Sequence, residues 1–552
     1  MKKSSYLKVL APTVALSMIL SACAGGKDES GDKKEKKGTV KQEVTILESA
    51  EVPTMDSVMA EDTLSFSQLN NTNEGLYRLD QDQKAVPGMA EGPATASEDG
   101  LTYTVKLRDA KWSNGDPVTA NDFVFAWQRA VNPDTASPYG PYMMAGKILN
   151  ADKIAAGKAK PETLGIKALD DKTLEIKLVK PIAYFESLMA FGTFLPQNEK
   201  YVKEQGKDYA SSSENVLSNG PFKITGWDGA EDVDWALEKN SEYWDAKSVV
   251  MEKINFNVQK EPQSSLNMFQ AGEADITPKL AQAGVIAQVE SDPQLVKWLE
   301  PTIFWLKINH THKALENENI RRALNMAIDK DALANDVLNN GSIAANYAVP
   351  QDFVKDEGGQ DFRAKYEAFN KYNVDEAKKL WEKGLSELGM KEIKLTYVSQ
   401  DTDTAKLTDA FIKDQLEKNL PGLKIELKNI PFAQKLKIED AMDYDLLFSG
   451  WGPDYLDPMT FSDLFITDGQ NNKMGYSNKE YDKLVADADK ETDAAKRWEM
   501  LQDAENVLLQ EDAGLIPVYQ RASNILVNEK VKGFTYHLVG AEYSYKWLKV
   551  EE

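Results

Sequence analysis

IKLTY (Ile393–Tyr397) and LKIEL (Leu423–Leu427) are two runs in which apolar and polar residues alternate, and a stretch around Asp409 to Leu416 has helical character between them. Alternation with a period of two predicts strands, with every second side chain on a buried face. Strands that alternate with helices indicate layers of sheet and helix. The sequence therefore predicts the α/β class.

The same pattern extends in both directions from this stretch. A helix is predicted at Ile320, Ala323, Leu324, Ala327 and Ile328, which have helical spacing. Thr119 is predicted to begin another helix, since Asp122 three residues later completes a capping-box pattern; Phe123, Ala126 and Trp127 would form its apolar stripe. Further strands are predicted at Val44–Leu47, Thr102–Leu107, Thr173–Leu178, Trp305–Ile308 and Ile516–Tyr519.

The N-terminus has the features of an export signal. Three lysines precede an apolar run, Val9–Leu20, that is too short to span a bilayer comfortably. The run ends in Leu20-Ser21-Ala22-Cys23, which resembles a bacterial lipobox, and Cys23 is the only cysteine. Residues 1–22 are therefore predicted to be a lipoprotein signal peptide, and Cys23 the residue that carries the lipid. The alternative is an ordinary secretory signal in which the cysteine occurs by chance.

Residues 23–39 are predicted to form the lipidated end and a flexible tether. Beyond Ala24 this segment is built from Gly, Ser, Thr, Lys, Asp and Glu. A flexible coil of this length has an r.m.s. reach of about 20–25 Å. We expect the protein to be held at the extracytoplasmic face of the cell membrane, with its folded part free to swing.

Charge and residue usage exclude several functions. The chain of 552 residues has 65 Lys and Arg against 88 Asp and Glu, a formal charge of -23. This field repels nucleic acid, so nucleic-acid binding is set aside. With a single cysteine, no disulfide forms within the chain, and its stability must come from packed cores.

Catalytic motifs are scarce in the sequence. The three histidines are His310, His312 and His537; the first two are two apart rather than four, so a zincin helix is excluded. We interpret this pair as part of a solvated turn after the predicted strand Trp305–Ile308. The alternative is a weak metal site. Gly450-Trp451-Gly452 begins like a dinucleotide fingerprint, but Tyr455 stands where the third glycine belongs. We expect no cofactor, no metal and no enzymatic activity.

Ten segments, beginning with AKWSNG at Ala110, resemble the oligopeptide- and dipeptide-binding proteins of peptide ABC importers, which are family 5 extracellular solute-binding proteins. The resemblance covers nearly all of the chain after the tether. Its segments are Ala110–Gly115, Pro117–Val124, Trp127–Arg129, Thr135–Tyr139, Leu164–Asp171, Ser218–Phe222, Asn240–Asp245, Ala271–Asp275, Arg321–Leu324 and Gly450–Pro458.

The resemblance implies a bilobed clamp of the periplasmic-binding-protein type with an extra small domain, three discontinuous domains in all. The implied ranges are 40–74, 197–300 and 516–552 for lobe I, 75–196 for the extra domain II, and 301–515 for lobe III. A peptide would lie between the lobes, held mainly by main-chain hydrogen bonds as in strand addition.

The resemblance also assigns site residues. Asp454 corresponds to the carboxylate that holds the peptide α-ammonium, a pairing that a buried cation requires. Trp451 and Tyr139 would line the site. The backbone of Gly450, Gly452 and the segment Glu61-Asp62-Thr63-Leu64 would flank the ligand, with glycine allowing close approach.

The sequence departs from the family pattern at two positions. Receptors restricted to short ligands carry an arginine where this chain has Phe448, and Phe448 is predicted to be one of the ligand-binding residues. Ala405 stands near the position of their carboxylate-contacting histidine. We therefore expect either that longer peptides are accepted or that specificity lies elsewhere.

The predicted function is that of a monomeric, lipid-anchored receptor that hands peptides to a membrane-embedded ABC permease. One alternative keeps the scaffold and changes the ligand to a signalling peptide, such as a pheromone. Two functions of a different class also stay open: a surface peptidase or hydrolase, and an adhesin or chaperone-like surface protein.

Overall fold

A computed structural model describes residues 40–182, 184–356, 358–366, 368–469 and 471–552. The predicted signal peptide, Cys23 and the tether lie outside these residues. Residues 41–552 form one compact unit. None of the helices in the described part of the chain is both long enough and apolar enough to cross a membrane.

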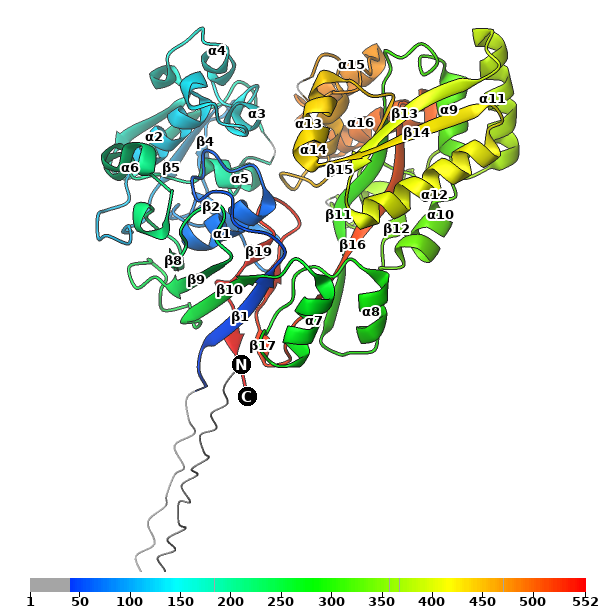
Figure 1. The fold of residues 1–552 in the computed structure, drawn as a ribbon. Helices are drawn as coiled ribbons and strands as arrows, with labels where there is room; N and C mark the ends of the chain where they lie inside the picture. Colours follow the sequence, from blue (N-terminus) through cyan, green and yellow to red (C-terminus); the bar gives the residue numbers. More distant parts are fainter. Residues whose placement is uncertain (1–39, 183, 357, 367, 470) are drawn as a thin grey trace, which may run out of the picture. The chain divides into compact units, whose positions relative to one another are not determined.

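Three sheets of four or more strands, each with helices beside it, give the unit its α/β character (Figure 1). Every strand predicted from alternation is present. The described helices are α1 (Thr63–Thr72), α2 (Ala120–Val131), α3 (Gly140–Met144), α4 (Ala151–Ala155), α5 (Phe185–Leu188), α6 (Glu199–Gln205), α7 (Pro262–Gln270), α8 (Ala283–Val289), α9 (Glu318–Met326), α10 (Lys330–Ala332), α11 (Val374–Leu388), α12 (Asp403–Asn419), α13 (Phe432–Ala441), α14 (Met459–Ser462), α15 (Lys479–Ala488) and α16 (Ala494–Asn506).

The first sheet combines the N-terminal strand with a segment about 200 residues later. Its order is β1-β10-β9-β8, from β1 (Glu43–Glu48), β10 (Lys253–Val258), β9 (Asp234–Lys239) and β8 (Phe222–Thr225). The C-terminal segment returns to this lobe because Asn71 of α1 binds it on both sides. The Asn71 amide donates to the Tyr543 carbonyl at 3.0 Å, and its oxygen accepts from the Tyr545 N–H at 2.7 Å. The segment contains β17 (Val531–Lys532), β18 (Thr535–Tyr536), β19 (Tyr543–Ser544) and β20 (Lys549–Val550).

The second sheet lies in the range expected for the extra domain. Its order is β4-β5-β7-β6, and a two-stranded sheet, β2-β3, lies beside it. Helix α2 begins as predicted: the Thr119 N–H donates to the Asp122 carboxylate at 2.8 Å, and Phe123, Ala126 and Trp127 are fully buried. The strands are β2 (Tyr77–Leu79), β3 (Ala85–Pro87), β4 (Thr95–Ala96), β5 (Thr102–Lys106), β6 (Ile166–Asp170) and β7 (Thr173–Lys177).

The third sheet has six strands in the order β12-β16-β11-β15-β13-β14, with helices on both faces (Figure 1). Side chains of α9, α11 and α12 share a core with Leu306 and Phe448, whereas Ile438 of α13 packs against Leu447 on the other face. The strands are β11 (Leu295–Ile308), β12 (Ile343–Ala344), β13 (Ile393–Gln400), β14 (Leu423–Ile430), β15 (Leu446–Trp451) and β16 (Leu515–Leu526).

One predicted helix is shorter than its apolar pattern. Helix α9 ends at Met326, yet Ala327 and Ile328 are fully buried beyond its end. Ala327 is the C-cap, and its N–H still donates to the Ala323 carbonyl, so the prediction is wrong only at Ile328, which is buried in the segment after the helix.

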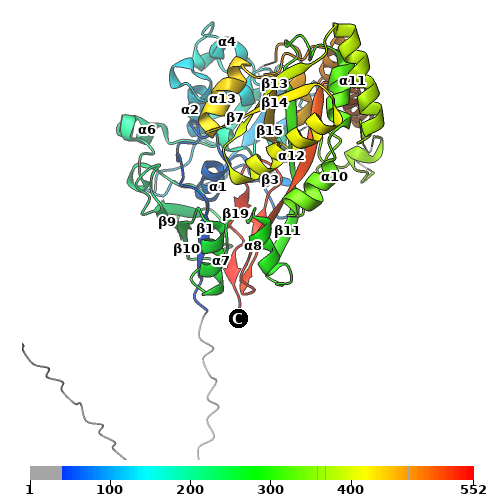
Figure 2. The same ribbon diagram turned by 45° about the vertical axis from the view of Figure 1, so that its right-hand side comes forward.

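Strands β11 and β16 connect the third sheet to the first lobe. They pair from Leu295–Leu526 to Lys307–Leu515, with an irregularity between Leu299 and Ile303. Figure 2 shows this ribbon running from the region of α8 up into the third sheet. The expected boundary at 300/301 falls inside β11, so the two lobes share continuous strands and meet at the irregularity.

Candidate ligand-binding cleft

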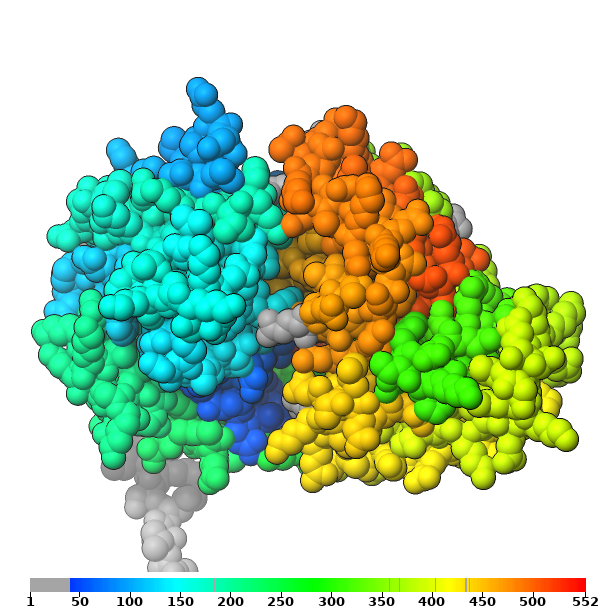
Figure 3. Space-filling model, turned by 90° about the horizontal axis from the view of Figure 1, so that it is seen from above, coloured from blue at the N-terminus to red at the C-terminus, as the bar shows by residue number. Residues whose placement is uncertain are grey.

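A cavity of about 890 Å³ lies between the two lobes. This volume is in the range of small-molecule sites. In the space-filling view, the blue-to-cyan segments and the yellow-to-orange segments face each other across a groove (Figure 3). Of the residues assigned by resemblance, the structure brings together Glu61, Asp62, Thr63, Tyr139, Gly450, Trp451, Gly452 and Asp454 in the cavity wall.

Strand pairing decides which residues of β15 face the cavity. Trp451 lies opposite Ile303, and Ser449 lies opposite Trp305, so these side chains share one face of the sheet. Phe448 lies opposite Leu306 on the other face. It is 5% exposed and packs against the rings of Phe304 and Tyr519. Phe448 is therefore a core residue and does not line the cavity.

One edge of β15 carries no neighbouring strand where it borders the cavity. The strand pairs with β11 along its whole length, but with β13 only at Leu446 and Leu447. From Phe448 to Trp451, the other edge lacks a partner strand among the described residues. An unpaired edge presents backbone N–H and C=O groups that an extended ligand can bind.

The two glycines beside this edge are constrained by side chains behind them. A Cβ atom on Gly450 would lie 2.9 Å from the ring of Phe304, and one on Gly452 would lie 3.2 Å from the Thr302 hydroxyl. Any larger residue at Gly450 would displace either Phe304 or the strand. The sequence therefore keeps this part of the cavity wall as bare backbone.

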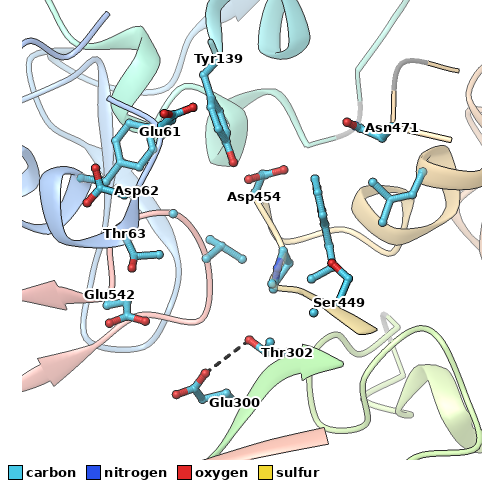
Figure 4. A pocket seen from close by; sticks show the side chains of 18 of the residues that line it. Glu61, Asp62, Thr63, Tyr139, Glu300, Thr302, Ser449, Asp454, Asn471 and Glu542 are labelled. Atoms are coloured by element: carbon cyan, nitrogen blue, oxygen red, sulfur yellow. Dashed lines mark hydrogen bonds between the residues drawn. The ribbon is translucent and has the colours of Figure 1, made fainter. Parts of the chain in front are cut away.

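Asp454 follows β15 and is 7% exposed (Figure 4). Its backbone N–H donates to the Thr460 hydroxyl at 3.0 Å, and its Oδ2 accepts from the Tyr142 hydroxyl at 2.9 Å. No hydrogen bond to Oδ1 is found in the described part of the chain. Burial raises the pKa of Asp454 to about 7, although the Tyr142 hydrogen bond and the charge of Lys147 oppose this rise. A cationic ligand group at Oδ1 would stabilise the ionised form.

Aromatic side chains form the wall beside Asp454. The ring of Tyr139 stacks on Phe191 at 5.6 Å and meets Phe66 edge-on at 5.7 Å. The ring of Tyr142 meets Trp451 edge-on at 6.4 Å. These contacts pack Tyr139 against α1 and Tyr142 against the end of β15, so the wall is built from segments on both sides of the cavity.

Glu61, Asp62 and Thr63 lie on the side of the cavity across from β15 (Figure 4). The Asp62 carboxylate accepts from the Ser65 N–H at 2.8 Å and thereby caps α1. Leu64 does not line the main cavity and instead borders a smaller adjacent pocket with Asp62 and Thr63. The structure therefore places three of the four predicted residues at the site.

Two groups of lining residues were not predicted from the sequence. At the floor, Glu300 accepts from Lys279 at 2.7 Å and pairs with Arg521. Burial would raise the pKa of Glu300, but the charges of Arg521 and Lys279 lower it to about 2. At one end, Lys307 and Lys435 both contact Glu439. The sequence signal was the lysine in the predicted strand Trp305–Ile308, which interrupts an apolar run.

The histidines have separate surroundings. His310 Nε2 lies 2.9 Å from the Gly514 carbonyl, and burial lowers the pKa of His310 to about 4. Because His310 is largely buried, the predicted turn is only partly solvated. His312 Nε2 lies 3.8 Å from an Asp445 oxygen. His537 lines the cavity, and burial lowers its pKa to about 3. No group of three or more His, Cys, Asp or Glu in the described ranges is arranged to hold a metal.

Residues from the ranges 75–196 and 301–515 also touch beyond the cavity. Lys180 forms an ion pair with Asp489, and the rings of Tyr184 and Tyr455 stack at 4.3 Å. The Leu456 N–H donates to the Ser187 hydroxyl at 3.2 Å. These contacts close the cavity on the side of Asp454.

Comparison with known proteins gives a consistent result. Residues 84–473 match the family described as bacterial extracellular solute-binding proteins, family 5 Middle. The oligopeptide-binding protein OppA of Bacillus subtilis is 35% identical over 94% of both chains. Listeria monocytogenes OppA bound to peptide is 42% identical with a TM-score of 0.82, over 93% of this chain and 100% of that one. The pheromone receptor PrgZ is 36% identical with a TM-score of 0.82 over the same shares.

Proposed function

Since this chain belongs to the family 5 bacterial extracellular solute-binding proteins, we propose that it is an extracytoplasmic receptor. It binds extended peptides and delivers them to an ABC importer. The observation that carries this proposal is the unpaired edge of β15, which ends beside the buried carboxylate of Asp454.

These two features match the two invariant parts of a peptide. The edge from Phe448 to Trp451 offers main-chain groups, which bind any sequence because every peptide unit has the same donor and acceptor. Asp454 offers one carboxylate oxygen to the α-ammonium, and pairing offsets the cost of burying both charges. Side-chain identity then contributes to specificity rather than to basic affinity.

Ligand binding and lobe closure are coupled in this proposal. A peptide between Glu61–Thr63 on one side and β15 on the other touches both lobes. It therefore binds the closed form more tightly than the open form and shifts the population toward closure. The importer would recognise the closed form.

The anchor and the absence of catalysis are further parts of the proposal. Cys23 would carry the lipid that holds the protein at the cell membrane, and the protein would act as a monomer. The relatives are binding proteins by name, which supports a receptor that leaves its ligand intact. A signalling peptide is the second candidate ligand, and the similarity to the pheromone receptor PrgZ supports it.

Native mass spectrometry of the purified protein tests the function. A nutrient-peptide receptor should copurify with a heterogeneous set of peptides, whereas a signalling receptor should carry a single species. Incubation with synthetic peptides should return them uncleaved. A protein that retains no peptide from a mixed digest, or that hydrolyses it, would contradict the proposal.

A further inference from the structure

A buried lysine of the protein itself lies near the proposed anchor for the ligand's ammonium group. Lys147, in the turn after α3, is 7% exposed. Its ammonium lies 5.7 Å from the centre of the Tyr142 ring and 6.0 Å from the centre of the Tyr455 ring. Among the described residues, none accepts a hydrogen bond from this ammonium. The two rings attract it through their faces, which leaves its three donors unused.

The same two tyrosines bind two different carboxylates. The Tyr142 hydroxyl donates to Oδ2 of Asp454 at 2.9 Å, and the Tyr455 hydroxyl donates to Oδ2 of Asp463, the residue after α14, at 3.2 Å. Oδ1 of Asp463 is buried, and no hydrogen bond reaches it in the described part of the chain. Lys147 is therefore near two carboxylates that each have one oxygen to spare.

The charges of this cluster balance only when a ligand ammonium is present. Lys147 carries one positive charge against the negative charges of Asp454 and Asp463. Two ion pairs border the cluster and are neutral in themselves: Lys180–Asp489 and Arg497–Asp457. Burial lowers the pKa of Lys147, and the largest opposing influence is the charge of Asp463, ahead of that of Asp454. Lys147 thus serves mainly as the counter-charge of Asp463, and Asp454 lacks one.

We propose that Asp463 is a positioning residue that keeps the Lys147 ammonium off Asp454, so that Asp454 stays open to the ligand's α-ammonium. This inference rests on the proposed function and explains how its anchor is kept vacant. An internal ammonium and the ligand's ammonium are chemically alike, so they compete for Asp454 unless the internal one has a partner of its own. Lys147 in turn neutralises Asp463, which would otherwise repel an ionised Asp454.

Asp463→Asn tests the competition. The substitution keeps the shape of the side chain and an oxygen that accepts from Tyr455, but it removes the counter-charge of Lys147, which can then pair with Asp454. The purified protein is titrated with random pentapeptides that have either free or N-acetylated amino termini. We expect the preference for free over acetylated peptides to fall by about tenfold in the variant. Loosening of the segment alone would weaken both libraries and leave their ratio unchanged.

A second substitution should reverse this loss. In the double variant Lys147→Met/Asp463→Asn the competing ammonium is absent, so the preference for a free amino terminus should return to within about threefold of that of the parent protein. Recovery on adding a second change at a buried position is the opposite of what accumulated structural damage produces. Lys153→Met, at an exposed position on α4, and Asp487→Asn, at an exposed pair on α15, are the matched controls and should behave as the parent.

The pH dependence of binding gives an independent readout. Lys147→Met leaves Asp463 without its counter-charge, which should raise the pKa of Asp454 and move the loss of affinity in acid to higher pH by about one unit. Asp463→Asn removes a like charge and should move it to lower pH. The double variant should lie between the two single variants, because it removes one charge of each sign. Titrations between pH 5 and pH 8 measure all three shifts.

The outcomes separate this inference from the proposed function. A parent-like preference in Asp463→Asn, a double variant that stays impaired, or shifts of the same sign in both single variants overturn the role of Asp463. If the parent protein retains peptides but does not prefer free amino termini, Asp454 is not the ammonium anchor, and the role of Asp463 is refuted with it. If the parent retains no peptide from either library, the proposed function itself is wrong.

Discussion

The hydroxyl of Tyr142 donates a 2.9 Å hydrogen bond to Asp454, and this bond joins residues that are 312 positions apart in the chain. Tyr142 belongs to α3, whereas Asp454 follows β15. Burial holds the pKa of Tyr142 well above its ordinary value, so the phenol remains a donor at every physiological pH. The carboxylate proposed to bind the ligand is therefore oriented from across the cleft.

Tyr142→Phe tests this orientation. Since the hydrogen bond favours the ionised carboxylate, its loss should raise the pKa of Asp454. The pH below which peptide affinity falls should therefore increase by about one pH unit. Calorimetric titration between pH 5 and pH 8 measures the shift. Tyr201→Phe, which removes a hydrogen bond from a half-buried tyrosine on α6 to the Glu214 carbonyl, serves as the control. An unchanged profile would show that Tyr142 does not act on Asp454.

Asp454→Asn should lose peptide affinity by at least about tenfold while the fold is retained. N-acetylated peptides should lose a similar amount with the parent protein, and acetylation should cost nothing further in the variant, since both changes remove one ion pair. Asp487→Asn, at an exposed pair on α15, is the control. Equal peptide affinities of the variant and the parent protein would contradict the proposal that Asp454 binds the ligand's α-ammonium group.

The stability of the same variant should depend on pH in a defined direction. The native state keeps a proton on Asp454 up to about pH 7, whereas the unfolded state releases it near its ordinary value of about 3.9. Ionisation therefore lowers the unfolding free energy of the parent protein as the pH rises through this window. The Tm of Asp454→Asn relative to the parent should increase between pH 4 and pH 7. A constant difference in Tm would contradict the raised pKa.

Peptide affinity should have a narrow optimum between about pH 7 and pH 8. Below this range Asp454 is protonated in the free protein, and above it the ligand's α-amino group, with a pKa of about 7.7–8.0, loses its proton. Each limb should approach a tenfold loss per pH unit. An affinity that is constant from pH 5 to pH 8 would exclude the Asp454–ammonium pair.

Phe448→Ala should destabilise the protein by about 3–5 kcal/mol and leave peptide affinity within about twofold, because the ring fills a core and faces away from the cavity. Urea unfolding and calorimetry at low temperature measure the two effects separately. Leu407→Ala, at an exposed position on α12, should change stability by less than about 0.5 kcal/mol. A loss of peptide affinity without a loss of stability would show that Phe448 contacts the ligand.

Cys23→Ala tests the anchor. The variant should lose labelling with radioactive palmitate and should move from the membrane fraction to the medium, since the sole lipid-accepting thiol is removed. Retention in the membrane fraction would refute lipid anchoring at this residue. Peptide binding by the released protein should equal that of the parent, because the described cavity contains no residue before Pro53.

Local patterns predicted the strands and the capped helix α2 because one face of each is buried and the other is not. The end of α9 was not predictable in this way, since Ala327 and Ile328 continue the apolar spacing after the helix has stopped. Apolar periodicity reports burial, and backbone geometry can change while burial continues. Most of the cavity residues assigned by resemblance lie in its wall, whereas Leu64 and Phe448 do not.

The missed residues have a common physical cause. Phe448 and Ser449 are neighbours in one strand, and only the pairing of Ser449 with Trp305 shows which of them faces the ligand. Lys435 and Glu439 have the spacing of an ordinary exposed helix pair. Their burial depends on β11, which lies more than 120 residues earlier in the chain, and no local pattern contains that information.

The ribbon of β11 and β16 has a consequence for recombination among relatives. The second lobe enters and leaves through these two paired strands, since Lys307 lies opposite Leu515. Exchange of this lobe between homologous receptors therefore requires only two crossovers, both at the irregularity near Leu299. Such chimaeras would carry the ammonium anchor of one parent and the tether of the other, so new ligand ranges can arise without new junctions inside either core.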